Sequence, residues 1–208
     1  EHYKLQNLNN QSTLINSTWF RQMKDSSLKS NAITLNGGLI RNYTHTVLDG
    51  EGASAEVYGV YLMDGTQHVD NQVVVDHAKP NCYSNELFKG ILDDEASAAF
   101  NGHILVRKDA QKTNAFQQNS SLVLSPWAVM DAKPQLEIFA DDVRCSHGAT
   151  IGHLDSLRAD RPKPHGGVDD HIPGLRDRDN QLPDPDAGRD VVGGGLGVPV
   201  DDVQRRRA

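Results

Sequence analysis

Seven short runs of β-forming residues constrain the fold of this chain more than any other feature of its sequence. The runs are NAITL, GLIRNYTHTVL, AEVYGVYLM, HVDNQVVVD, HILVR, SLVLS and QLEIFA. Valine, isoleucine, tyrosine and threonine are frequent in them, and these residues favour extended strands. In QLEIFA, a period of two places Leu136, Ile138 and Ala140 on one face. The runs therefore predict an all-β fold.

Glycine preceded by Asn or Asp marks the expected turns between these runs. The pairs are Asn36-Gly37, Asp49-Gly50, Asp64-Gly65 and Asn101-Gly102. These residue types adopt positive φ at low cost, which tight turns require. One segment, SNELFKGILDD, instead resembles a helix, because Leu87 and Ile91 are four residues apart, although Gly90 lowers its helix propensity.

Many short strands can form a sandwich, a barrel or a solenoid. The hairpins of a sandwich would predict tight turns that repeat evenly. In this chain the connections vary, and they carry many Asn, Ser and Thr residues that can stack in successive coils. The pattern favours a parallel β-helix, although its repeat is too irregular to establish that fold by period.

A sharp change in composition near Asp155 divides the chain into two parts. Every Phe, Tyr, Trp, Met, Cys and Glu residue lies before it. Residues 156–208 contain ten Asp, eight Arg, eight Gly and six of the nine Pro residues, without a sustained apolar period. We therefore predict a folded body over residues 1–155 and a largely disordered low-complexity tail over residues 156–208.

The composition of the tail also suggests how it arose. Asp, Arg, Gly and Pro are residues that GC-rich codons encode when they are read out of frame, so a frameshift after about Asp155 is a hypothesis. The coding DNA tests it, because one alternative frame should encode an amphipathic helical continuation. The glycine cluster VVGGGLG in the tail lacks the Lys-Ser/Thr ending of a phosphate loop and is not expected to bind nucleotide.

Charge and hydropathy restrict the function classes. The chain of 208 residues has a formal net charge of −7, so the backbone of a nucleic acid would be repelled on average. No apolar run approaches the roughly 18 residues of a membrane span. The first residues, EHYKLQNLNN, lack a Met and the regions of a signal peptide, so we expect an N-terminally truncated fragment of a longer protein. Neither a nucleic-acid nor a membrane partner is expected.

Cysteine usage indicates a reducing, cytoplasmic setting. Cys82 and Cys145 are the two cysteines of the chain, and they cannot form a disulfide framework or a four-cysteine metal site. Asn-x-Ser/Thr sequons begin at Asn10, Asn16, Asn42 and Asn119. A chain rich in Asn, Ser and Thr produces sequons by chance, and nothing else in the sequence indicates secretion.

The stretch DDVRCSHGATIGHLD contains the most informative side chains. Cys145 and His147 are two residues apart, and the residues alone leave open a metal site, the remains of a nucleophilic site, or a turn. On a strand both side chains would point to one face, and thiolate and imidazole both suit iron. Two ligands are too few for a closed site, so another chain would have to supply the rest. Gly148 is expected to let the chain turn, and His153 to be an ordinary polar residue.

The segment VDHAKPNC contains a second group, Asp76, His77 and Cys82. Neighbours on a strand point to opposite faces, so we expect these to be solvated residues at a strand end. A Ser-His-Asp hydrolase is disfavoured, because the chain has no Gly-x-Ser-x-Gly elbow.

Two aspartate pairs, Asp93-Asp94 and Asp141-Asp142, suggest an alternative function. Extracellular β-helix enzymes that act on carbohydrates place aspartates on neighbouring coils as general acid and base. The simpler interpretation, which we prefer, is that these aspartates lie in solvated turns.

Four blocks of the sequence resemble a known family. SNELFKGILDD, DAQKTNAFQ, KPQLEIFADDV and CSHGATIG occur in the order and with the spacing of the SufD family, from the SUF (SufBCD) iron–sulfur cluster assembly system. The resemblance is dense over residues 50–155. The paralogous SufB family typically has a Glu-His-Glu-Ala-Thr-Thr-Ser type block in place of CSHGATIG, so the resemblance is to SufD rather than SufB.

This resemblance implies a right-handed parallel β-helix that acts as a non-catalytic scaffold. It implies pairing with SufB and with the SufC ATPase, a nascent iron–sulfur cluster shared with SufB, and a reduced flavin associated with the whole complex. His147, and less firmly Cys145, would lie at the SufB interface beside the forming cluster. SufD-like chains end in a helical segment that docks SufC. The tail stands in its place here, so SufC binding by this chain is left open.

Overall fold

The computed structural model describes residues 1–154. The predictions for the tail, disorder and a frameshift over residues 156–208, lie outside the described residues. The described strands are β1 (His2–Asn7), β2 (Thr13–Gln22), β3 (Ser27–Asn36), β4 (Leu39–Leu48), β5 (Ser54–Met63), β6 (His68–His77), β7 (Tyr83–Leu92), β8 (Ser97–Val106), β9 (Thr113–Val123), β10 (Val129–Ile138) and β11 (Val143–His153). No helix in this part of the chain is long and apolar enough to cross a membrane.

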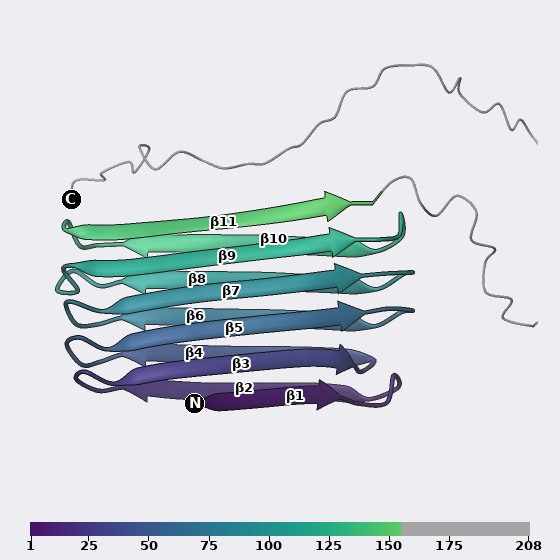
Figure 1. The fold of residues 1–208 in the computed structure, drawn as a ribbon, viewed down its shortest axis with the longest axis horizontal. Coiled ribbons are helices and arrows are strands. Elements are labelled where there is room, and N and C mark those ends of the chain that lie inside the picture. Colours follow the sequence, from purple (N-terminus) through teal and green to yellow (C-terminus); the bar gives the residue numbers. More distant parts are fainter. Residues whose placement is uncertain (155–208) are drawn as a thin grey trace, which may run out of the picture.

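The strands form two parallel sheets that wind into a solenoid. The odd-numbered strands form one sheet in the order β1-β3-β5-β7-β9-β11, and the even-numbered strands form the other, from β2 to β10. In Figure 1 the odd strands lie in front and point right, the even strands lie behind and point left, and the chain rises from β1 to β11. This path is right-handed. The prediction of a right-handed parallel β-helix is therefore confirmed.

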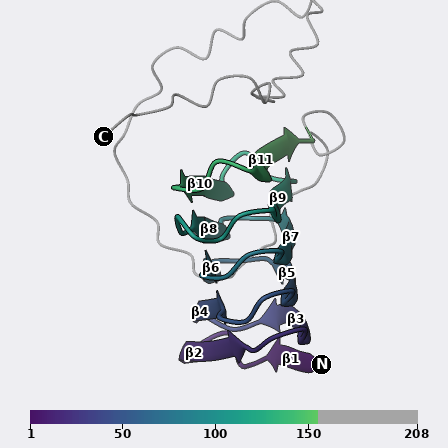
Figure 2. The ribbon, with the colours of Figure 1, turned by 90° about the vertical axis from the view of Figure 1, so that its left-hand side faces the viewer.

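The interior of the solenoid is filled by every second residue of each strand. Figure 2 shows the two sheets as facing columns of strands. On β8, for example, Ala98, Phe100, Ile104 and Val106 are buried, because side chains alternate between the faces of a strand. Removing these apolar side chains from water is the main stabilising contribution to such a stack. The predicted alternation in QLEIFA is confirmed, since its inward residues join the same core.

Two glycines leave space in the core for aromatic rings. Gly90 on β7 is the register partner of Tyr61 on β5, and Gly59 on β5 is the partner of Phe88 on β7. A Cβ atom on Gly90 would lie 2.0 Å from the Tyr61 ring, and one on Gly59 would lie 2.2 Å from the Phe88 ring. No side chain fits at either glycine while the rings keep these positions.

The prediction of a helix for SNELFKGILDD is wrong, because the segment forms strand β7. A spacing of four residues puts Leu87 and Ile91 on one face of a strand as well as of a helix, so the spacing could not decide between them. Alternate burial along β7 follows a period of two, with Glu86 and Phe88 inside.

The turn prediction is confirmed for three of the four Asn/Asp-Gly pairs, which lie where one strand ends and the next begins. Gly65, for example, has a φ of 56°. The prediction is wrong for Asn101-Gly102, which lies within β8. A Cβ atom at Gly102 would lie 2.3 Å from Nε2 of Gln117 on β9, so this glycine makes room for an inward side chain instead of a turn.

Candidate functional site at the open end of the solenoid

Cys145 and His147 both lie on β11, and their side chains share its inward face. Their register partners on β9 are Ala115 and Gln117, which are buried inside the solenoid. Strands stacked in register place equivalent side chains above one another. The two-residue spacing therefore has the predicted consequence, and the alternative that Cys-Ser-His is simply a turn is wrong.

The inward face of β11 lies at an open end of the stack. Among residues 1–154, β11 is the last strand of its sheet, and no described strand pairs with its far edge (Figure 1). His147 is exposed there, whereas Cys145 is half-buried. A second chain can therefore reach the His147 imidazole directly.

Gly148 does not turn the chain, so that expectation is wrong. It lies within β11, and its φ is not among the positive values found at Gly37, Gly52 and Gly65. A Cβ atom at Gly148 would meet no atom within 4 Å. The absence of a side chain leaves free space on the outward face of β11. Close approach of a partner's backbone at this point stays a prediction.

Cys145 is protected by its surroundings. It packs beside the apolar cluster that includes Ile104, Val106 and Ala115. Burial raises the pKa of the Cys145 thiol to about 11, although a hydrogen bond with the backbone of Ala115 acts in the opposite direction. The group is therefore a thiol at neutral pH and must lose a proton before it can bind a metal. The exposed imidazole of His147 is the more accessible ligand of the two.

A buried polar pair lies beneath His147. Gln117 Nε2 donates a hydrogen bond to Glu86 Oε2 at 3.0 Å, and the two residues are register partners on β9 and β7. Burial raises the pKa of Glu86 to about 8, while the bond from Gln117 acts to lower it. The carboxyl is therefore mainly neutral at pH 7. Sequence reasoning missed this pair, because it assigned Glu86 to a helix, where no inward position could be recognised.

The described residues contain no closed metal site. Within residues 1–154, no group of three or more His, Cys, Asp or Glu side chains could hold a metal ion. Cys145 and His147 offer two candidate ligands, whereas iron–sulfur clusters are commonly held by four. This donor set fits a nascent cluster only if a second chain completes it.

Asp76, His77 and Cys82 are buried, so the expectation that they are solvated is wrong. Asp76 accepts hydrogen bonds from Arg107 Nε at 2.9 Å and Nη2 at 2.6 Å. His77 Nε2 instead contacts Ser84 Oγ at 2.8 Å, and burial lowers the pKa of His77 to about 4. The two neighbours have separate partners, as opposite faces of a strand require, and they do not form one site.

The two aspartate pairs are not brought together. Asp93-Asp94 follow the end of β7, whereas Asp141-Asp142 precede the start of β11. Since β7, β9 and β11 are parallel and in register, about a strand length of roughly 30 Å separates the pairs. The carboxyls of a glycosidase must lie within about 10 Å of each other. These pairs therefore cannot act as one acid and base.

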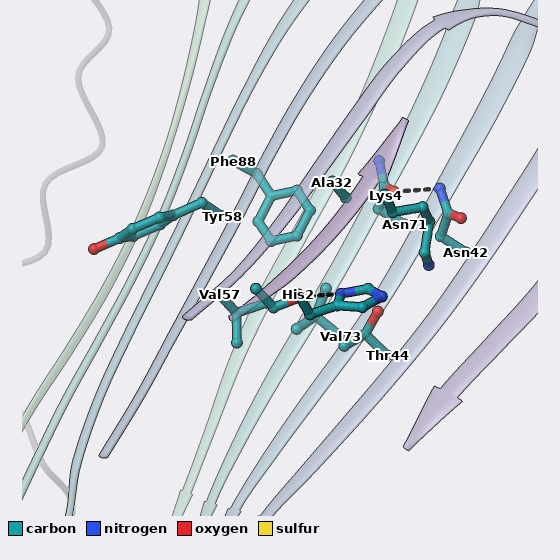
Figure 3. Close-up of a pocket in the computed structure, with 11 residues that line it drawn as sticks. His2, Lys4, Ala32, Asn42, Thr44, Val57, Tyr58, Asn71, Val73 and Phe88 are labelled. Atoms are coloured by element: carbon teal, nitrogen blue, oxygen red, sulfur yellow. Dashed lines mark hydrogen bonds between the residues drawn. The ribbon is translucent and has the colours of Figure 1, made fainter. Parts of the chain in front are cut away.

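A small hollow, with room for about one water molecule, lies at the other end of the stack, among the first coils (Figure 3). Its lining residues are His2, Lys4, Ser30, Ala32, Asn42, Thr44, Val57, Tyr58, Asn71, Val73 and Phe88. Polar groups here are already paired: His2 Nδ1 contacts Ser30 Oγ at 2.9 Å, and Lys4 Nζ donates to Asn16 Oδ1 at 2.7 Å. None of its residues lies on β9 or β11, so the hollow is separate from Cys145 and His147.

The fold is a parallel β-solenoid with an open inward face at β11, and comparison with known families identifies its class. The family described as SUF system FeS cluster assembly, SufBD core domain, matches residues 1–158. The chain therefore belongs to the SufBD core domain family of the SUF iron–sulfur cluster assembly system.

Several relatives agree with this assignment. The chain is 38% identical over 132 residues to the iron–sulfur cluster assembly protein SufD of Escherichia coli, which covers 64% of this chain and 31% of that protein. It is 36% identical over 155 residues to a SufBD family protein of Synechocystis, and the match covers 74% of this chain and 34% of that protein. It is 34% identical over 158 residues to protein ABCI7, chloroplastic, of Arabidopsis thaliana, and the match covers 74% of this chain and 33% of that protein. The chain spans about a third of the length of these relatives.

Proposed function

We propose that this chain is the SufD-type, non-catalytic scaffold subunit of a SUF complex, and that its β11 end pairs with a SufB-type subunit. The observation that carries the proposal is the placement of Cys145 and His147 on the inward face of a strand whose far edge no described strand covers. The cluster under assembly would lie between this face and the partner, with His147 as a ligand and Cys145 as a secondary candidate.

The backbone of β11 favours such pairing. Leu154 N donates to Val123 O at 3.0 Å, which shows that residues of this parity bond to β9. In a parallel strand, alternate residues bond to opposite sides, so His147 and Ala149 direct their N–H and C=O groups to the far edge. An unpaired edge of this kind is a template for a strand from another chain.

The sequence of β11 supports the SufD-type over the SufB-type assignment. It contains Cys-Ser-His-Gly at residues 145–148, where the SufB-like block would have Glu-His-Glu. The relative in Escherichia coli is itself named SufD.

The remaining parts of the proposal concern the whole complex. ATP hydrolysis would belong to a SufC-type subunit, whose docking segment would lie beyond the described residues of this chain. A reduced flavin would be bound at the level of the complex, and we assign it no residue. We place the complex in the cytoplasm, with neither nucleic acid nor membrane as a partner.

Co-expression with a SufB-type subunit, followed by size-exclusion chromatography, tests the proposed interface. Ala149→Pro removes an N–H group directed to the far edge without removing a bond to β9, and proline is tolerated on edge strands. We expect this variant to fold and to weaken pairing roughly tenfold, which is the effect of removing about one well-formed backbone hydrogen bond.

Leu5→Pro on β1 is the matched control, because it alters an exposed residue of the edge strand at the opposite end of the stack. It should leave pairing unchanged. The proposal would be contradicted if this chain stays monomeric beside a soluble SufB-type subunit. It would also be contradicted if Ala149→Pro and Leu5→Pro weaken pairing equally.

A further inference from the structure

Gln117 has a buried amide oxygen without a partner, one coil below His147. The residue is 3% exposed, and its Oε1 atom has no hydrogen-bond partner among the described residues. An unpaired polar atom inside a protein is unfavourable, because it has lost water and gained nothing in exchange. Oε1 of Glu86, on the coil below, is unpaired as well. Of the two residues, Gln117 is the one that lies directly beneath His147 in the register.

The orientation of this amide is fixed by its neighbours. Gln117 Nε2 donates to Glu86 Oε2 at 3.0 Å. The space for the amide exists because Gly102 on β8 has no side chain, since a Cβ atom there would lie 2.3 Å from Nε2 and 2.6 Å from Cδ of Gln117. With Nε2 held by Glu86, Oε1 is the atom left for the coil above.

His147 is the residue of the coil above. It is the register partner of Gln117, so the two inward side chains stand one above the other on adjacent strands, which are about 4.8 Å apart. His147 has two ring nitrogens, and a hydrogen bond from one determines which is left for a metal.

We propose that Gln117 is a positioning residue for His147: its Oε1 accepts a hydrogen bond from one ring N–H and leaves the other ring nitrogen for iron, while Glu86 holds the amide from below. The inference rests on the proposed role of His147 as a cluster ligand. Metal-binding histidines commonly donate their second ring N–H to an acceptor of this kind, which fixes the ring orientation. A neutral Glu86 supports Gln117 without adding a buried negative charge.

Nuclear magnetic resonance of the full chain, labelled with ¹⁵N at histidine, tests the geometry without any metal. His147→Gln assigns the His147 signals. The ring N–H of His147 should exchange with water at least tenfold more slowly than that of His153, an exposed histidine on the same strand. Equal exchange rates in the wild-type chain would overturn the proposal, whatever the variants do.

Gln117→Met removes the acceptor and keeps the side-chain length. It should raise the exchange rate of His147 to that of His153 and bring its two tautomers to the ratio of free imidazole. Gln118→Met is the matched control, because it makes the same substitution at the next residue of β9, which is exposed. It should leave both His147 signals unchanged. Unchanged His147 signals in Gln117→Met would contradict the positioning role.

Iron bound per complex with a SufB-type subunit, at limiting iron, separates this inference from the proposed function. Loss of the hydrogen bond to a ligand typically costs 10–100-fold in metal affinity, so Gln117→Met should lower loading roughly tenfold. If His147→Ala does not lower loading, the proposed cluster role is wrong. If His147→Ala lowers loading but Gln117→Met does not, the positioning role alone is wrong.

Discussion

The Tyr61 ring occupies the space that a side chain of Gly90 would need, because the two residues are register partners on adjacent coils. The hydroxyl of Tyr61 then contacts Ser121 Oγ on β9 at 2.9 Å. A single side chain thus ties together β5, β7 and β9. The backbone ladders set the spacing of the coils below β11, and contacts of this kind fill the space between the two sheets.

Gly90→Ala should destabilise the solenoid by about 1–3 kcal/mol, the usual cost of overpacking a filled core, because the new methyl group must displace the Tyr61 ring. Urea unfolding measures the change. Gly148→Ala is the control, since a Cβ atom there meets nothing within 4 Å. Equal free energies of unfolding for the two variants would show that the Tyr61–Gly90 contact is not a tight one.

Stability should fall as the pH rises from 6.5 to 8, because of Glu86. The folded chain keeps the Glu86 proton up to a pKa of about 8, whereas the unfolded chain releases it near 4.5. Unfolding therefore releases a proton in this window, and the free energy of unfolding decreases by at most about 1.4 kcal/mol per pH unit. Denaturant titrations at the two pH values measure this loss.

Glu86→Gln should flatten this dependence, since an amide does not titrate. His77 acts in a different window: its pKa is about 4 in the folded chain against an ordinary 6.5, so the unfolded chain binds a proton first. That effect lowers stability as the pH falls towards 4, and it fades above about pH 7.5, where the unfolded histidine is no longer protonated. An identical slope between pH 6.5 and 8 in wild type and Glu86→Gln would contradict the buried neutral carboxyl.

Much of the fold could be predicted from sequence, because β-forming runs and Asn/Asp-Gly turns are local signals. Segments whose apolar spacing fits both the period of a helix and the period of a strand could not be assigned to either from sequence. Leu87 and Ile91 share a face in a helix and in a strand, and the pairing of this segment with β5 and β9, which no local pattern specifies, makes it a strand. The turn predicted at Asn101-Gly102 was wrong for a similar reason. A glycine that makes room for Gln117 on another coil cannot be distinguished by sequence from a glycine in a turn.

The candidate site was predictable only in part. Two residues of separation correctly put Cys145 and His147 on one face of a strand. Glu86 and Gln117 are 31 residues apart and meet through the register of β7 and β9, which no local pattern specifies. The burial of Asp76 and His77 was missed because their hydrogen-bond partners, Arg107 among them, come from other coils or from beyond the next turn.

Cys145 should react slowly with iodoacetamide at pH 7.5. A thiol with a pKa of about 11 has roughly a hundredfold less thiolate than one with the ordinary value of 9.0, and the thiolate is the reactive form. A Cys82→Ser background isolates the reaction, since serine keeps a donor for the carbonyl of Gly50. Mass spectrometry follows the labelling. A rate equal to that of the urea-unfolded chain would show that burial does not protect Cys145.

The isolated chain should not hydrolyse ATP above background, because its one glycine-rich cluster lacks the Lys-Ser/Thr ending that binds phosphates. Phosphate release across size-exclusion fractions is the appropriate assay. Activity that follows the peak of the chain, and disappears when the chain is denatured, would contradict the scaffold assignment.

The most direct test of a scaffold role measures iron and acid-labile sulfide per complex for the wild-type chain and His147→Ala, each co-purified with a SufB-type subunit. His153→Ala is the control, because it removes another exposed histidine from β11. We expect His147→Ala to lower both contents at least fivefold (roughly 1 kcal/mol), while the melting temperature of the complex changes little and His153→Ala behaves as wild type. Wild-type iron and sulfide in His147→Ala would contradict the account, as would a collapse of its melting temperature.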